Sequence, residues 1–120
     1  MRMWMVEPKW MCRKHLLGEH VEHHMFVGTI NKKKQLNGYV EHNCVEPSKL
    51  RFRHDELVLE MDRRGYKHNS KLPEFSLGYL PKDVIKARVN VKKSLHNLMR
   101  RCHECRCRWF GIDYIGGGRK

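Results

Sequence analysis

The sequence predicts an all-α protein, a compact single domain of three helices joined by long loops. Three separate stretches repeat their apolar residues every three to four positions, which is the helical period. No stretch has the alternation and turn residues of a β-hairpin, and no internal repeat is evident. A chain of 120 residues suits one domain, so we expect a single domain over residues 1–120 with a frayed tail over 112–120.

The first helix is expected to run from about Arg13 to the Asn37-Gly38 pair, a common helix stop. The period places His15, Glu19 and Glu22 on one exposed stripe. The other side of the helix is expected to be apolar and to hold Leu16, Leu17, Val21, Met25, Val27 and Ile30.

A loop over residues 38–48 is expected to lead to a second helix. Ser48 is a suitable N-cap for this helix, and Gly65 suits the position just after its end. The apolar face of the helix consists of Leu50, Leu57, Val58 and Met61.

After a loop over residues 66–79, Pro81 can open a third helix that continues to Arg101. One face of this helix carries Val84, Val91, Leu95 and Leu98, and the opposite face carries Lys82, Lys86, Lys93 and Arg100. A basic face is often only solvated. The absence of acidic residues from this stripe favours a surface that follows phosphates.

The charge balance favours nucleic acid as the partner. The chain has 25 Lys and Arg against 13 Asp and Glu, for a net charge of +12. The N-terminal apolar residues are interrupted by Glu7, Lys9 and Arg13, unlike a secretory signal. With an odd number of cysteines, five, an extracellular disulfide framework is disfavoured, and we expect an intracellular protein of a bacterium or of a virus-infected host cell.

The cysteines and histidines form no complete metal motif. Cys102, Cys105 and Cys107 lie together, but a structural zinc usually needs a second ligand cluster, which only Cys12 or Cys44 could supply. Among the histidines, no two-His-plus-carboxylate pattern falls on one face. We therefore expect reduced structural thiols, no metal and no cofactor.

Three blocks carry a family resemblance. They are MRMW…PKW…RKHLLGEHVEHH at the N-terminus, LRFRHDELVLEMDRRGY in the second helix, and GYLPKD before the third. Together they resemble the pyrimidine-dimer DNA glycosylases, the phage-type endonuclease V family and its bacterial relatives. The tail agrees loosely, with WFG where the family has an aromatic cluster ending in Gly.

The resemblance implies an all-α enzyme that cleaves the glycosidic bond at a UV photoproduct and then nicks the backbone by β-elimination, as an AP lyase. It implies that the α-amine of Met1 is the nucleophile and that Glu22 assists it. Arg2 matches a position that contacts lesion and phosphate, and His15 and Glu19 match positions close to the site. An α-amine has an unperturbed pKa of roughly 7.7–8.0, so about a tenth is neutral at pH 7, far more than of a lysine. Because Arg2 is large, the initiator Met should be retained, whereas the best-known phage members expose a Thr.

DNA contact is expected to differ from that of the phage enzymes. Val21 and Met25 occupy positions where those enzymes have arginines, so contact should shift toward the third helix and Asn31–Lys34. The expected substrate is double-stranded DNA carrying a lesion, bound by a monomer without any membrane. The cations expected to hold it are Arg2, Lys14, Lys86, Lys92 and Lys93.

Two alternatives remain open. The protein could be a non-catalytic basic nucleic-acid-binding module, with zinc as a possible stabiliser. It could also be a sibling glycosylase that uses the same amine on another damaged or modified base.

Overall fold

The expected all-α class is confirmed. The computed structural model describes residues 1–67 and 71–111, and within these ranges every regular element is a helix. None of the described helices is both long and apolar enough to cross a membrane. The expected frayed tail, residues 112–120, lies outside the described residues. In place of three helices the described chain forms two short 3₁₀ helices and six α-helices: η1 (Pro8–Trp10), α1 (Arg13–Asn31), α2 (Asn37–Glu41), η2 (Pro47–Lys49), α3 (Leu50–Arg63), α4 (Lys82–Ile85), α5 (Val91–Arg101) and α6 (His103–Phe110).

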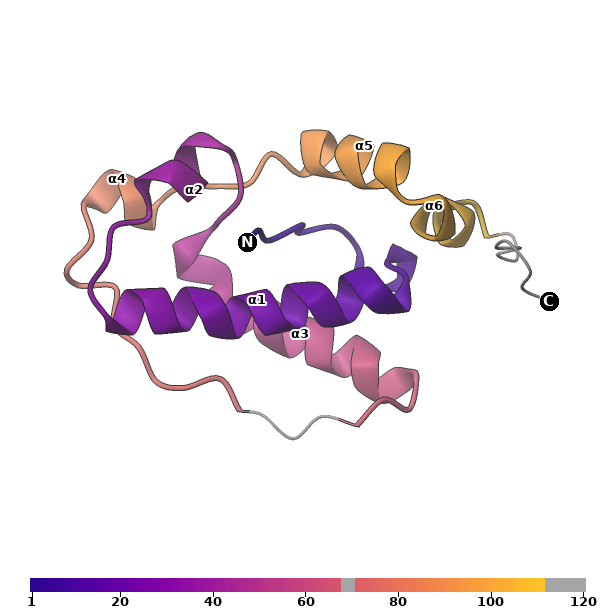
Figure 1. Ribbon diagram of the computed structural model, residues 1–120, viewed down its shortest axis with the longest axis horizontal. Coiled ribbons are helices and arrows are strands. Elements are labelled where there is room, and N and C mark those ends of the chain that lie inside the picture. The colour runs from indigo at the N-terminus through magenta and orange to yellow at the C-terminus, as the bar shows by residue number, and fades with distance from the viewer. Residues whose placement is uncertain (68–70, 112–120) are drawn as a thin grey trace.

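The long helix α1 forms the spine of the molecule, which measures 49 × 31 × 19 Å (Figure 1). Helix α3 packs across one side of α1, and the extended N-terminal segment lies between α1 and α5 (Figure 1). Helices α2 and α4 lie at one end and α6 at the other. The start of the chain is thereby placed in the middle of the fold, beside the spine.

The core has two parts, one at each end of α1. The part toward α6 gathers side chains from the N-terminal segment, α1, α3, α5 and α6, among them Trp4, Leu16, Leu57, Leu98 and Cys105. The part toward α2 and α4 is built around Met3, Phe26, Leu36, Leu50 and Val84.

The expected apolar side of α1 is wrong in two positions. Val21 and Met25 are 55% and 50% exposed, while Glu19 and His23 are buried. Helix α1 is rotated so that its buried face mixes apolar and polar side chains. The reason lies in α3, where an arginine occupies the middle of the apolar face.

Arg53 and Glu19 form a buried, bidentate ion pair between α3 and α1. The guanidinium donates from Nε to Oε2 at 2.8 Å and from Nη2 to Oε1 at 2.9 Å. It also donates from Nη1 to the Val6 carbonyl at 2.7 Å, which fixes the N-terminal segment. Burial alone lowers the pKa of Arg53, but the charges and hydrogen bonds of Glu19 and, to a smaller extent, of Glu56 together outweigh it, and the net shift is upward. This pair sets which face of α1 is turned toward α3.

The first helix is shorter than expected, since it was expected to reach Asn37-Gly38 and it ends at Asn31. Lys33 adopts a left-handed backbone conformation with φ of 59°, and the Lys34 N–H donates to the Thr29 carbonyl. The Asn37-Gly38 pair, expected as a helix stop, lies inside α2 instead.

Helix α3 ends where it was expected to end, but its N-cap is not the residue that was expected. Gly65 follows the C-cap Arg64 with φ of 79°, a conformation that glycine adopts without strain. Ser48 is not the N-cap, since it lies within η2 and Lys49 takes that position.

The expected third helix is interrupted by long-range hydrogen bonds. The Val89 N–H donates to Glu46 Oε2 at 2.9 Å, and the Asn90 N–H donates to Asn43 Oδ1 at 2.7 Å. Asn90 then caps α5 by accepting the Lys93 N–H at 3.1 Å. The backbone groups that a continuous helix would use are therefore bonded elsewhere.

As a consequence, the basic stripe does not form one helix face. Lys82 lies on α4 and Lys86 caps its end, whereas Lys93 and Arg100 lie on α5.

Replacing Arg53 by Met should destabilise the fold, because the Glu19 carboxylate would remain buried without a counter-charge. We expect the free energy of unfolding to fall by about 3–5 kcal/mol. Arg51→Met, on the same helix, removes the exposed ion pair between Arg51 and Glu74. It should lower the free energy of unfolding by less than about 1 kcal/mol. Urea denaturation measures both.

The double variant Arg53→Met/Glu19→Leu tests the cause of this loss. With both charges removed, much of the stability should return. Equal losses in the double and single variants would mean that packing, and not the charge pair, accounts for the effect.

Candidate active site

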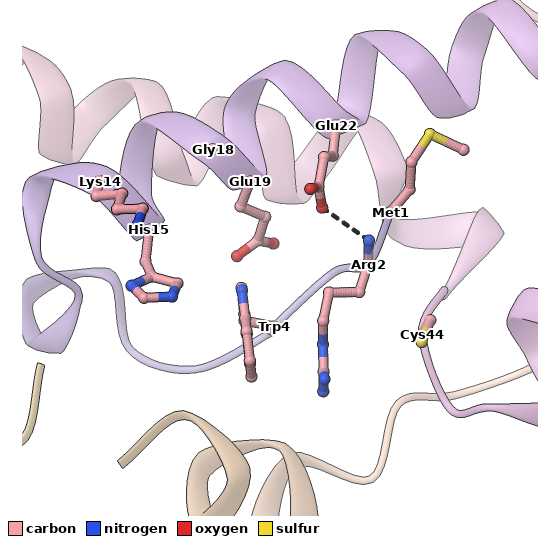
Figure 2. A pocket seen from close by; sticks show the side chains of 9 residues that line it. All are labelled: Met1, Arg2, Trp4, Lys14, His15, Gly18, Glu19, Glu22 and Cys44. Atoms are coloured by element: carbon pink, nitrogen blue, oxygen red, sulfur yellow. Dashed lines mark hydrogen bonds between the residues drawn. The ribbon is translucent and has the colours of Figure 1, made fainter. Parts of the chain in front are cut away.

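A cleft of about 430 Å³ opens between the N-terminal segment and α1 (Figure 2). Residues of α1 that are three or four positions apart line one wall, because this spacing places them on one helix face. The cleft is lined by Met1, Arg2 and Trp4 of the N-terminal segment, by Lys14, His15, Gly18, Glu19 and Glu22 of α1, and by Cys44.

The start of the chain is fixed to Glu22. The backbone N–H of Arg2 donates to Glu22 Oε1 at 2.7 Å (Figure 2). Met1, whose α-amine precedes this nitrogen by one residue, also lines the cleft. The first residue of this chain and a carboxylate are thus held side by side.

The Arg2 side chain completes a polar wall with Trp4 and Ser94. Its guanidinium lies over the Trp4 ring, 3.7 Å from the centroid, and its Nη2 donates to Ser94 Oγ at 3.4 Å. Ser94 in turn donates to the Trp4 carbonyl at 2.6 Å, which fastens α5 to the N-terminal segment. Partial burial lowers the pKa of Arg2.

The two carboxylates of the stripe have different environments. Glu19 is 1% exposed, so the expectation of an exposed stripe is wrong for this residue, and both of its oxygens bond Arg53. Glu22 is half-buried and forms no ion pair among the described residues. Its negative charge is therefore available to a bound molecule, while that of Glu19 is already neutralised.

His23 supports the same wall from inside. Its Nδ1 donates to the Glu19 carbonyl at 2.9 Å. Burial lowers the pKa of this imidazole, which is therefore neutral near pH 7.

The structure brings together most of the expected site residues but leaves three outside the cleft. Lys14 and His15 line it alongside Met1 and the two carboxylates. Lys86, Lys92 and Lys93 are exposed and do not line it. Lys92 and Lys93 border a separate hollow of about 590 Å³ that reaches Trp109.

Sequence reasoning missed Trp4, Gly18, Cys44 and Ser94. For Gly18 a signal existed, since a glycine inside a helical pattern often marks a close approach or a site. A Cβ at Gly18 would meet no atom within 4 Å, so the space beside this residue is open and no close approach requires the glycine. Nothing in the local sequence places Ser94 next to the N-terminal segment.

Among the residues that the structure describes, two clusters of metal-ligating side chains form across the helices. Cys12, His15, Cys102 and Cys105 have donor atoms within 4.8 Å of one another, and so do His20, His24 and His54. The sequence left either Cys12 or Cys44 to complete the tail cluster, and in the structure Cys12 lies beside Cys102 and Cys105. Cys44 lines the cleft instead.

A family model for pyrimidine dimer DNA glycosylase matches residues 1–74. The match covers the N-terminal segment, α1 and α3, and thus every residue that lines the cleft. No curated protein and no solved structure matches the chain.

Proposed function

We propose, since the chain belongs to the pyrimidine dimer DNA glycosylase family, that it excises pyrimidine dimers from UV-damaged DNA through the α-amine of Met1 and then nicks the backbone as an AP lyase. The observation that carries this proposal is the hydrogen bond between the Arg2 N–H and Glu22. Only the Cα and carbonyl carbon of Met1 separate its amine from this nitrogen, so the two nitrogens lie within about 3.7 Å of each other. A nucleophile and a carboxylate therefore share one wall of the cleft.

The proposed chemistry begins with attack of the amine nitrogen on C1′ of the deoxyribose. The bond between C1′ and the base breaks, and the base leaves with the bonding electrons. The attacking nitrogen loses one proton. The C1′–O4′ bond then breaks, O4′ takes up a proton, and the nitrogen lone pair forms a protonated imine with C1′. Removal of a C2′ proton then expels the 3′ phosphate, which is the β-elimination step.

Glu22 is proposed to assist at two points. As an unpaired carboxylate it stabilises the cationic sugar that develops when the base leaves. It can also accept the proton that the amine loses on forming the imine. Glu19 cannot substitute for it, because its charge is neutralised by Arg53.

The remaining cleft residues are proposed to bind the substrate. Arg2 and Lys14 offer positive charge to phosphates at the cleft, and His15 lines it next to Lys14 (Figure 2). A glycosylase must expose the sugar carbon, usually by extruding a nucleotide. Trp4 is buried and its ring is covered by the Arg2 guanidinium, so it holds Arg2 in place at the cleft. Outside the cleft, the duplex phosphates are proposed to be contacted by the exposed Lys86, Lys92 and Lys93.

Glu22→Gln should fold like the parent and bind lesion DNA, yet lose about 10²–10⁴ in glycosylase rate. The amide oxygen can still accept the Arg2 N–H, so the N-terminal segment keeps its place. Single-turnover excision on a dimer-containing duplex measures the rate, and thermal melting checks the fold.

Glu41→Gln, an exposed residue of α2, is the matched control and should retain full activity. Glu19→Gln should differ from both, because it removes the buried carboxylate from Arg53, leaves only the part-exposed Glu56 as its charged partner, and lowers the melting temperature. An unchanged rate in Glu22→Gln would move the assisting role to another group.

Borohydride should trap a covalent protein–DNA adduct on lesion-bearing duplex, because it reduces the imine. Peptide mapping should place the adduct on Met1. Acetylation of the amine, or one additional residue before Met1, should abolish the adduct while duplex binding falls less.

Other results of this experiment separate the alternatives. Trapping that survives a blocked N-terminus would assign the nucleophile to a lysine. Trapping only on another damaged base would identify the sibling glycosylase, and no trapping on any lesion would leave the non-catalytic binding module.

Charge reversal at Lys86 and Lys93 should weaken binding to damaged and undamaged duplex alike. Phosphate contacts carry no sequence or lesion information, and each one lost should reduce the slope of log K against log salt by about 0.9. Fluorescence anisotropy across a salt series measures the slope. Lys67→Glu, which follows the end of α3, is the charge-matched control, and an equal loss in all three variants would argue against a DNA face at α4 and α5.

A further inference from the structure

We propose that Cys12, His15, Cys102 and Cys105 bind one structural zinc ion. The four residues come as two pairs with the same spacing, Cys-x-x-His and Cys-x-x-Cys, from distant parts of the chain. The fold brings their donor atoms within 4.8 Å of one another. Three thiolates and one imidazole form a ligand set that is typical of structural zinc sites.

The spacing of the donor atoms, all within 4.8 Å of one another, is compatible with one tetrahedral ion after small side-chain shifts. With Zn–S of about 2.3 Å and Zn–N of about 2.0–2.1 Å, tetrahedral geometry requires S···S edges of about 3.8 Å and S···N edges of about 3.6 Å. The sulfurs of Cys12 and Cys102 are 3.8 Å apart. His15 Nδ1 lies 3.2 Å from the Cys12 sulfur and 3.7 Å from that of Cys105.

The backbone around the cluster is arranged to stabilise thiolates. Each of the three sulfurs accepts a backbone N–H: Cys12 from His15 at 3.4 Å, Cys102 from Cys105 at 3.4 Å, and Cys105 from Cys12 at 3.1 Å. Hydrogen bonds donated to sulfur favour its charged form, which is the form that binds a metal.

The two pairs also occupy equivalent places in their helices. Cys12 is the N-cap of α1 and Cys102 is the N-cap of α6, and each accepts the N–H of the third residue that follows. Both helices therefore direct their positive ends toward the cluster, where zinc with three thiolates would carry a net negative charge. Two such arrangements that face one another form a closed set of four ligands.

A structural role follows from the position of the cluster. Cys12 and Cys105 are 2% and 0% exposed, and four protein ligands leave no open position for a substrate. The ion would join the start of α1, the helix that carries Glu22, to the α5–α6 pair, whose Ser94 bonds the Trp4 carbonyl of the N-terminal segment. Small chains commonly use such a metal to supplement a limited core.

A disulfide is the competing use of these thiols. It would require an S–S distance of about 2.05 Å and would leave the third thiol and His15 without a role. All the cysteines are free in the structure.

The zinc content of the full-length protein tests the proposal without reference to DNA or activity. Protein purified without chelator should contain one zinc per chain by elemental analysis. Replacement by Co²⁺ should give the thiolate-to-cobalt charge-transfer and d–d absorption bands of tetrahedral coordination. Removal of the metal should lower the melting temperature.

Cys105→Ser and Cys102→Ser should lose zinc and the cobalt spectrum. Cys107→Ser is the matched control, because it is buried on the same helix but lies outside the cluster, and it should retain both. A folded parent protein without metal, a disulfide found by non-reducing mass spectrometry, bound iron in place of zinc, or zinc retained in both ligand variants would each overturn the proposal.

Discussion

The ion pair between Arg53 and Glu19 is the interaction on which the rest of the site depends. It buries two charges between α3 and α1. Loss of Arg53 would leave the Glu19 carboxylate uncompensated, and loss of Glu19 would leave Arg53 with only the part-exposed Glu56. Because the same guanidinium also holds the Val6 carbonyl, it fixes the N-terminal segment against both helices. The rotation of α1, and hence the face that it turns toward the cleft, follows from this one arginine. The path of the first residues follows from it as well.

Because of this ion pair, two carboxylates that are three residues apart have different roles. On an isolated helix Glu19 and Glu22 would be equivalent members of one stripe. In the fold, Glu19 is neutralised by Arg53 and acts as part of the framework, whereas Glu22 keeps its charge and accepts the N–H of Arg2. A site that stabilises a developing positive charge needs such an unpaired carboxylate, held in place by groups whose own charges are already balanced.

The sequence predicted what depends on local periodicity and missed what depends on long-range polar bonds. The helical class and the glycine after α3 follow from spacing alone. The rotation of α1 was predicted incorrectly, because a hydrophobic pattern gives no place for a buried glutamate unless its arginine is recognised in α3. Arg53 does lie between Leu50 and Leu57 on the buried face, so a charge within an apolar stripe was the available signal. No local sequence signal marked the helix break at Val89, since the Val89 N–H donates to Glu46, 43 residues earlier in the chain. The cleft residues Met1, Arg2 and Glu22 came from the family resemblance, while Ser94 is brought next to Arg2 and Trp4 only by the tertiary fold.

The cleft and the proposed zinc cluster meet at one residue. His15 lines the cleft, and its Nδ1 faces the sulfurs of Cys12 and Cys105. A zinc bound at Nδ1 would fix the imidazole orientation and leave only Nε2 for the cleft, as outer hydrogen bonds and ligation do for other metal-bound histidines. The ion pair holds the cleft from the α3 side, and the cluster would hold it from the α6 side. The N-terminal segment lies between these two supports, which is a way to keep the flexible first residue of a chain in one position.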